Sequence, residues 1–403
     1  MRRARTDWLA VSILFLALGA IFWLDAQVTS ALSSPSHLAT DLGAPPASPQ
    51  AWTVQHNVPT KYRVLYRWIV QATCAWLCAP DDAPGFYRAF FFWGYIFFAG
   101  TLAALYYYLR ALDFTARWAF AGGVLFLVSP PVAFAYKYPV FTREDPLAYG
   151  LVLLGLLAMF KQNPRGVALA ATLGALTRET TLIVPLVYAV AARAPWRVKL
   201  GVCAPPLIAA LGIRVALGWA SYDPFVDSIY NFETPWQTLA FLFCVFGFLW
   251  LPYLLQMRAL ARAPQFASDA WRILGRTAPL ILALVLGTHL VLARAREIRI
   301  AFLLFPWAIP FALAWFHARR AQLGAWVRRP TTWVLTLAGF GLLTSAVVFT
   351  KRAFPGAYGY LADFNNNHWL ILGNLHVFVT LVGVVPLLWL ARRARNDSPG
   401  AVF

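Results

Sequence analysis

The chain has 403 residues, of which 60% are hydrophobic and only 12% are charged, and its mean hydropathy is +0.61. Soluble domains carry roughly a quarter charged residues, so this composition excludes a soluble globular protein and requires a lipid bilayer around it. The net charge of +18 would suggest nucleic-acid binding in a soluble protein. Here the basic residues lie in short segments between apolar runs, the positive-inside pattern of membrane proteins, and nucleic acid is not an expected partner.

Apolar runs of about 20 residues recur along the chain, and each is long enough to cross the hydrocarbon core as a helix. The first run follows Arg2, Arg3 and Arg5, and we interpret it as a retained span because it is longer than a signal-peptide core. The pattern predicts about ten full spans, near residues 8–24, 89–109, 118–135, 147–160, 200–219, 237–257, 277–293, 299–316, 331–349 and 369–390.

Residues 166–192 are too short for two full spans of about 20 residues and are interrupted by Thr177-Arg178-Glu179-Thr180. A hairpin of two half-length helices would return the chain to its starting side and keep fourteen later basic residues in the cytoplasm: Arg193, Arg197, Lys199, Arg258, Arg262, Arg272, Arg276, Arg319, Arg320, Arg328, Arg329, Arg392, Arg393 and Arg395. A single crossing would export them and retain only Arg294, Arg296, Arg299, Lys351 and Arg352. The charge distribution favours the hairpin, with both termini cytoplasmic.

The sequence therefore predicts an all-α fold, a polytopic transmembrane helical bundle that forms a single integral membrane domain over residues 1–403. The longest extracytoplasmic loop is the first, about residues 25–88, and a juxtamembrane surface helix is expected near residues 62–76. Cys74 and Cys78 lie in this loop and could pair in an oxidising compartment, although unpaired thiols on one helix face are the expectation.

Acidic residues crowd the extracytoplasmic side of this topology. Of the 16 in the chain, twelve lie there, and the other four are Asp7, Asp113, Asp269 and Asp397. Carboxylates beside guanidinium groups are suited to deprotonating an acceptor while a phosphate is held. The asymmetry indicates that the chemistry takes place on the outer face.

Two motifs in the first half of the chain supply such groups. Arg63 and Arg67 lie one turn apart on the expected surface helix, where cations that merely anchor the helix are an equally good explanation. Arg143, Glu144 and Asp145 precede the fourth span, where the helix dipole favours acids. A simple helix cap would explain Asp145, but not its two neighbours.

Two further motifs lie later in the chain, after the fourth predicted span. Arg178 and Glu179 fall in the hairpin, deeper in the membrane than loops usually lie, where charges are costly and are functional candidates. The alternative is that Arg178 and Glu179 pair with each other and only stabilise a bend in the chain. Arg296, Glu297 and Arg299 lie between two spans against the positive-inside trend, although ordinary loop charge could explain them.

This layout resembles the C-fold (GT-C) glycosyltransferases, membrane enzymes that take a sugar from a polyprenyl phosphate or pyrophosphate carrier on the extracytoplasmic face. The shared features are a first span with a long outer loop, a Lys-Tyr-Arg-Val-Leu segment before the second span, Arg-Glu-Asp-Pro before the fourth, the Leu-Thr-Arg-Glu-Thr hairpin and a later Arg-Glu-Ile-Arg. The resemblance covers the architecture of most of the chain, but each motif is short.

The resemblance implies roles for individual residues. A first-loop carboxylate, Asp25 or Asp41, would act as the base or orient the acceptor, and Glu144 and Asp145 would assist it or bind a divalent cation such as Mg²⁺ or Mn²⁺. The expected contacts to the carrier phosphate and substrate are Arg63, Arg67, Arg143, Arg178, Glu179, Arg296, Glu297 and Arg299. The chain lacks the family's Asp-x-Asp or Glu-x-Asp directly after the first span. The resemblance therefore identifies neither the catalytic base nor a requirement for a metal ion.

The expected function is transfer of a sugar from a polyprenyl-phosphate-linked donor to a glycan, lipid or protein acceptor, in a bacterial inner (plasma) membrane and in cell-envelope glycan biosynthesis. The alternative is a transporter or flippase for a lipid-linked or anionic solute, with the hairpin as a discontinuous helix at a midplane site. Against transport, no inverted repeat is visible in the sequence. Only Arg178, Glu179 and Arg214 are charged residues that are candidates to lie well inside the bundle. A noncatalytic assembly subunit, which would tolerate loss of every outer carboxylate, is a third interpretation.

Overall fold

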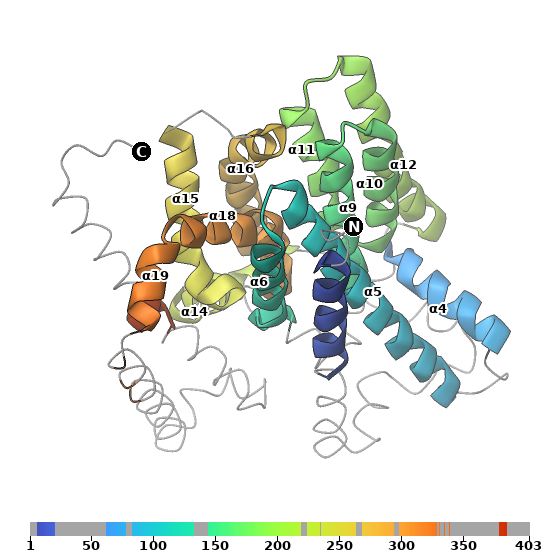
Figure 1. Cartoon of the computed structure of the whole chain (residues 1–403). Helices are drawn as coiled ribbons and strands as arrows, with labels where there is room; N and C mark the ends of the chain where they lie inside the picture. Colours follow the sequence, from blue (N-terminus) through green and yellow to red (C-terminus); the bar gives the residue numbers. More distant parts are fainter. Residues whose placement is uncertain are drawn as a thin grey trace.

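The computed structural model describes residues 6–20, 62–77, 83–132, 144–218, 224–233, 235–262, 268–293, 298–328 and 379–384, with the single residues 330, 334 and 338 (Figure 1). Within these residues every regular element is helical and there is no strand, which confirms the all-α prediction for this part of the chain. The longer helices are α4 (Val64–Leu77), α5 (Ala83–Ala111), α6 (Ala116–Leu127), α9 (Asp145–Phe160), α10 (Pro164–Thr177), α11 (Ile183–Ala191), α12 (Trp196–Leu217), α13 (Pro224–Glu233), α14 (Pro235–Phe246), α15 (Trp250–Arg262), α16 (Asp269–Leu292), α18 (Phe305–Ala318) and α19 (Arg320–Val327).

Several helices are suited to a bilayer. In the described residues, five segments are long and apolar enough to cross a membrane: Phe92–Ala111, Trp196–Leu217, Thr238–Ala261, Asp269–Leu292 and Ile298–Ala318. Each overlaps a predicted span, and three shorter apolar helices overlap three more: Thr6–Ala20, Ala116–Leu127 and Asp145–Phe160. The predicted spans 331–349 and 369–390 lie almost wholly outside the described residues. By length and composition, these helices are compatible with an integral membrane protein.

Helix α12 has the most apolar outer surface of these segments. Only 17% of the residues in its apolar stretch are buried inside the protein. Its large side chains Leu200, Ile208, Leu211 and Val215 are exposed. A continuous apolar surface along 22 residues is suited to lipid and not to water. We therefore describe α12 as a lipid-facing helix.

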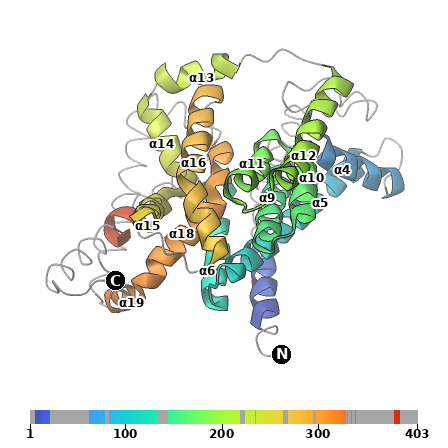
Figure 2. The same cartoon turned by 90° about the horizontal axis from the view of Figure 1, so that it is seen from above.

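Helices α9, α10, α11 and α12 follow one another back and forth on one side of the molecule (Figures 1 and 2). Asp145, at the start of α9, pairs with Arg178, directly after the end of α10, so these two helices are antiparallel. Lys199, near the start of α12, donates a hydrogen bond from Nζ to the carbonyl of Ala189, near the end of α11, at 2.7 Å. The two half-length helices expected over residues 166–192 are thus present as α10 and α11.

The helical path breaks at Arg178, whose backbone is extended (φ −163°, ψ 134°) before a four-residue 3₁₀ helix, η2 (Glu179–Leu182). The Thr181 hydroxyl donates to the Arg178 carbonyl at 2.7 Å, and the Thr177 hydroxyl donates to the Leu173 carbonyl at 2.8 Å. Threonine hydroxyls that bond to nearby carbonyls favour departures from a regular helix, and β-branching adds to this. The threonines around the arginine therefore explain where α10 ends.

The break packs closely against Gly174 in the last turn of α10. A Cβ atom at this position would lie 2.7 Å from Thr181 Oγ1 and 2.8 Å from Thr181 Cβ, both shorter than real Cβ contacts. Small residues allow such close backbone approach inside a membrane bundle. Glycine at this position lets η2 fold back onto α10.

Substituting alanine for Gly174 is expected to lower the free energy of unfolding by about 1–3 kcal/mol, because the added methyl group forces Thr181 away from α10. The measurement is thermal unfolding of the purified chain in detergent. The control is Gly212→Ala on α12, where the new Cβ would meet no atom within 4 Å. Equal destabilisation by both substitutions would contradict the role of this close approach.

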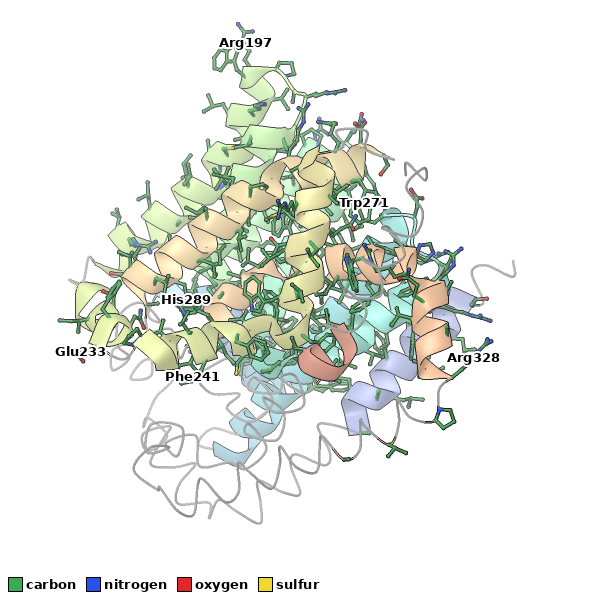
Figure 3. The ribbon with its side chains drawn as sticks, turned by 90° about the vertical axis from the view of Figure 1, so that its left-hand side faces the viewer. Arg197, Glu233, Phe241, Trp271, His289 and Arg328 are labelled. Atoms are coloured by element: carbon green, nitrogen blue, oxygen red, sulfur yellow. The ribbon has the colours of Figure 1, made fainter. Side chains whose placement is uncertain are left out.

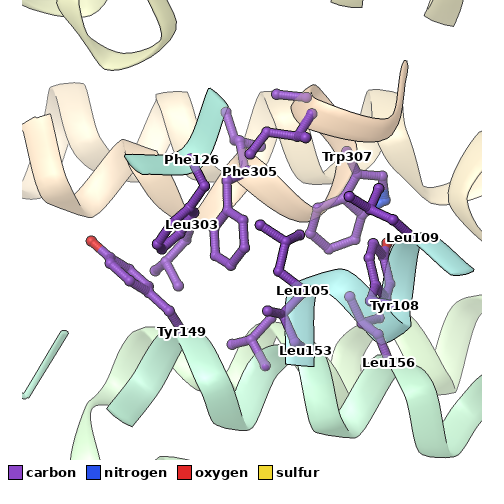
Figure 4. Close-up of a cluster of buried hydrophobic side chains, with 14 of the residues drawn as sticks. Leu105, Tyr108, Leu109, Phe126, Tyr149, Leu153, Leu156, Leu303, Phe305 and Trp307 are labelled. Carbon is purple, nitrogen blue, oxygen red and sulfur yellow. The ribbon is translucent and has the colours of Figure 1, made fainter. Parts of the chain in front are cut away.

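An aromatic cluster joins α6, α9 and α18 and supports the start of α9 (Figure 4). Phe305 lies with its ring centroid 5.3 Å from that of Phe126 and 5.4 Å from that of Tyr149, both in edge-on geometry. All three side chains are fully buried. The Tyr149 hydroxyl donates to the backbone carbonyl of Arg299 at 3.2 Å, so the cluster fixes this arginine relative to α9.

The surface helix predicted near residues 62–76 is present as α4. Its Tyr66 and Val70 side chains are buried, whereas Trp68 and Trp76 are exposed, which is the pattern of an amphipathic helix at a membrane interface. Cys78 lies outside the described residues, and the side chain of Cys74 does too, so their pairing stays a prediction.

Residues 224–233 form α13, a helix in a region that the sequence pattern treats only as a short loop. The Asn231 amide donates to the carbonyls of Leu290 at 2.9 Å and Ala293 at 2.7 Å, at the end of α16. The last carbonyls of a helix have no partner within it, and Asn231 supplies one from a neighbouring element. Helix α13 therefore lies against the end of α16 (Figure 2), with Ile229 and Phe232 exposed.

Candidate functional site

Asp145 is the most deeply buried acid of the site and begins α9. Its side chain is 0% exposed and pairs with the 1% exposed Arg178, while Arg299 Nη1 lies 3.6 Å from Asp145 Oδ2. Pro146 follows in the first turn, and its carbonyl accepts a 2.6 Å hydrogen bond from the Thr101 hydroxyl on α5. This contact fixes the N-terminus of α9, where the helix dipole favours a negative charge.

Glu179, the first residue of η2, forms the second ion-pair centre. Its Oε2 lies 3.4 Å from Arg63 Nε, and its Oε1 lies 3.3 Å from Arg214 Nη2. Arg63 directly precedes α4, and Arg214 lies in the last turn of α12. One carboxylate therefore bridges two cations from helices that are far apart in the sequence.

Tyr62 and Arg214 connect the start of α4 to the end of α12. The Arg214 guanidinium carbon lies 4.9 Å from the centroid of the Tyr62 ring, in a cation–π arrangement. The Tyr62 hydroxyl donates to the Gly218 carbonyl at 3.0 Å, and Arg214 Nη1 donates to the Ala210 carbonyl at 3.0 Å. Arg214 is thus held by its own helix and by an aromatic ring as well as by Glu179.

The network has an inner and an outer layer. In the inner layer Asp145 lies between Arg178 and Arg299, and the side chains are 0%, 1% and 13% exposed. In the outer layer Glu179 lies between two further arginines and is 24% exposed. The ion pairs join two acids (Asp145 and Glu179) to four arginines (Arg63, Arg178, Arg214 and Arg299). With Glu144, which directly precedes Asp145 and is buried, there are three acids, so four minus three leaves a formal charge of +1.

The excess positive charge gives the network a chemical preference. Charges buried in a bundle are stable only with partners, and each acid in the two layers faces two guanidinium groups. Guanidinium groups match the geometry of phosphate oxygens and can hold them with paired hydrogen bonds. The arrangement is therefore suited to an anion with phosphate-like geometry at its partly exposed outer layer.

The network lies at one end of α9 to α12, and a basic group of residues lies at the other end. Arg193, Arg197 and Lys199 are near the junction of α11 and α12, on the far side from Arg214. Figure 3 shows Arg197 at one extremity of the molecule and Glu233 far below it. The two ends of the four-helix layer therefore differ in their charged residues: one end has these three basic residues, and the other has the network of acids and arginines.

Several predicted site residues come together, and others lie outside the described part of the structure. Those brought together by ion pairs are Arg63, Asp145, Arg178, Glu179 and Arg299. Glu144 directly precedes Asp145 and is buried at 1% exposure. Those outside the described residues are Asp25, Asp41, Arg143, Arg296 and Glu297. Arg67 has its backbone in α4, but its side chain is not among those described.

Arg214 is a member of the network that the four outer-face motifs do not include. It stands alone between apolar residues in α12, so no local pattern connects it with Glu179. The one signal in the sequence is its position, a charge inside a long apolar run, which is a functional candidate by default. Tyr62 belongs to the Lys-Tyr-Arg-Val-Leu segment identified in the sequence. Its contact with Arg214 does not follow from the spacing of the two residues along the chain.

A cavity of about 200 Å³ lies elsewhere, lined by residues 112–115, Trp118, Trp271 and His317. Thr101, which anchors the charged network, is on α5, and Leu112 lies roughly 16 Å further along at 1.5 Å per residue. The cavity is thus separate from the network.

The acids of the network do not fit a divalent cation. Both oxygens of Asp145 and both oxygens of Glu179 face guanidinium groups, which already supply positive charge. Among the residues that the structure describes, no group of three or more His, Cys, Asp and Glu side chains has the arrangement of a metal site. No step proposed below passes through a metal.

Comparisons of this chain with protein-family models, with curated proteins and with solved structures find no match.

Proposed function

We propose that the chain is a membrane glycosyltransferase that moves a sugar from a polyprenyl phosphate or pyrophosphate donor to an acceptor on the extracytoplasmic face. The observation that carries the proposal is the gathering of Arg63, Asp145, Arg178, Glu179 and Arg299 from four separate sequence motifs into one network with excess positive charge. Motifs that carry only loop charge or helix anchors have no reason to meet.

The proposed topology has about ten spans, both termini in the cytoplasm and the network on the extracytoplasmic side. The membrane would be a bacterial inner (plasma) membrane. Support comes from the two ends of α9 to α12, since Arg193, Arg197 and Lys199 lie at the end opposite to the network. Basic residues favour the cytoplasmic side, so the proposed orientation has the network on the outer side.

The proposed reaction is an inverting displacement at the anomeric carbon of the sugar. The bond between this carbon and the phosphate oxygen breaks, and the electron pair leaves with the phosphate, whose charge the arginines stabilise. A new bond forms between the anomeric carbon and an acceptor hydroxyl oxygen. The hydroxyl proton passes to an outer-face carboxylate, for which Asp25 and Asp41 are the candidates. In this proposal Glu144 assists the base, and the buried Asp145 keeps Arg178 and Arg299 in position.

The test of this function is lipid-linked sugar turnover in membranes that contain Asp25→Asn, Asp41→Asn or Glu144→Gln at matched expression. Loss of the base is expected to reduce transfer by about 10²–10⁴-fold, the usual contribution of general base catalysis. A carboxylate control is Glu233→Gln, because Glu233 is exposed on α13 outside the network. Unchanged transfer in all three site variants would contradict the proposed mechanism.

One observation favours a transporter or flippase as the second candidate. Asp145 and Arg178 form a buried ion pair beside a broken helix, and discontinuous helices with polar groups line the substrate sites of many transporters. Solute uptake or lipid flipping in proteoliposomes, measured without any acceptor, would separate the two functions, because a transferase requires an acceptor for turnover.

A further inference from the structure

The outer layer of the network already has the form of an anion site. Glu179 directs one oxygen to Arg63 and the other to Arg214, at 3.4 and 3.3 Å. Two oxygens of a tetrahedral phosphate can contact two separate guanidinium groups in the same way. The inner layer offers no such access, because the Asp145 side chain is completely buried.

The two arginines keep their positions without Glu179. Arg214 is held by the Tyr62 ring at 4.9 Å and by the Ala210 carbonyl. Arg63 is the next residue after Tyr62, so the contact between Tyr62 and Arg214 also sets the spacing of the two guanidinium groups. The side chain of Arg63 is only 9% exposed, which limits its alternative positions.

Glu179 is the member of this group that is able to move. It is the first residue of η2, so its side chain can turn away from the two arginines while Thr181 keeps its packing against Gly174. Its two contacts are longer than the 2.7–2.9 Å typical of charge-assisted hydrogen bonds. Its side chain is 24% exposed, so an incoming anion can reach the same two arginines.

We propose that Arg63 and Arg214 form the seat for a phosphate group and that Glu179 occupies this seat until the phosphate displaces it. The inference rests on the proposed function and deepens it, because it assigns the phosphate to two of the four arginines and adds Arg214 to the site. Glu179 then competes with the phosphate and does not bind it. In the resting state the carboxylate offsets one of the two positive charges, which would otherwise repel each other in a partly buried site.

The test measures the dissociation constant of two probes, inorganic phosphate and a short-chain polyprenyl phosphate, for the full chain in nanodiscs. Removing the competing charge in Glu179→Gln is expected to tighten binding about tenfold, whereas Arg214→Gln weakens it by at least about tenfold. Tyr62→Leu removes the ring that holds Arg214 and is expected to weaken binding without changing any charge. Arg272→Gln is the control, because Arg272 pairs with Asp269, away from the network.

Unchanged or weaker binding in Glu179→Gln would overturn the proposal. If Glu179 had only a structural role, its replacement would lower stability and would not tighten phosphate binding. If this variant does not fold, equal binding by Tyr62→Leu and the wild type would overturn it instead. Binding of inorganic phosphate that follows the expected pattern, without binding of the polyprenyl phosphate, would support the seat but contradict the lipid donor of the proposed function.

Discussion

Asp145→Asn is expected to lower the free energy of unfolding by about 3–5 kcal/mol, the usual effect of removing one partner from a buried ion pair. The substitution preserves the shape of the side chain but leaves Arg178, which is 1% exposed, without its buried carboxylate. Arg299 loses its partner at 3.6 Å as well. The effect is measured as the shift in thermal unfolding of the purified chain in detergent.

The matched control is Asp269→Asn, which removes the same chemical group from an ion pair on the surface. Asp269 is 57% exposed, and its oxygen lies 2.9 Å from Arg272 Nε within one turn of α16. Surface pairs contribute little, so little change is expected. Similar shifts for both variants would mean that the inner layer of the network is not the stabilising element described above.

Cysteine labelling is expected to give an all-or-none result that reports the topology. Arg165, at the start of α10, and Arg197, at the start of α12, lie at the same end of the four-helix layer, whereas Glu233 lies beyond the other end (Figure 3). In intact cells an impermeant maleimide is expected to label Glu233→Cys and to leave Arg165→Cys and Arg197→Cys unlabelled. Permeabilised cells are expected to show labelling of all three.

The background for this experiment carries serine at the four native cysteines, Cys74, Cys78, Cys203 and Cys244. Labelling of Arg165→Cys and Arg197→Cys from opposite sides would show a single crossing between them and would contradict the hairpin. Labelling of both from outside would instead invert the proposed orientation while keeping the hairpin.

The break of the hairpin and its charged residues were predictable from local sequence. Residues 166–192 are too short for two spans, and Arg178 and Glu179 interrupt them among threonines. Both signals are local, since they depend on span length and on the cost of charge in lipid. The structure has the break at the same residues. The total number of spans stays a prediction, since residues 331–349 and 369–390 lie almost wholly outside the described part.

The partners within the site were not predictable in the same way. Asp145 at the start of α9 is explained locally by the helix dipole, and nothing near it in the sequence indicates that Arg178 and Arg299 are its partners. Arg214 meets Glu179 only because α12 runs antiparallel to α11. Helix α13 was missed for a different reason. A pattern of apolar spans does not reveal a short helix with polar residues, and its Asn231 contacts carbonyls at the end of α16 that only the structure shows.

The ion pairs also constrain how the chain is inserted during synthesis. A charged side chain is costly to insert into a bilayer alone, and this holds, at a lower cost than at a helix centre, for charges at helix ends such as these. Asp145 is synthesised first, Arg178 follows after one more helix, and Arg214 meets Glu179 only when α12 is complete. Helices α9 to α12 therefore leave the translocon most favourably as one unit, and a chain truncated between α9 and α10 would present an unpaired aspartate to the lipid and to membrane quality control.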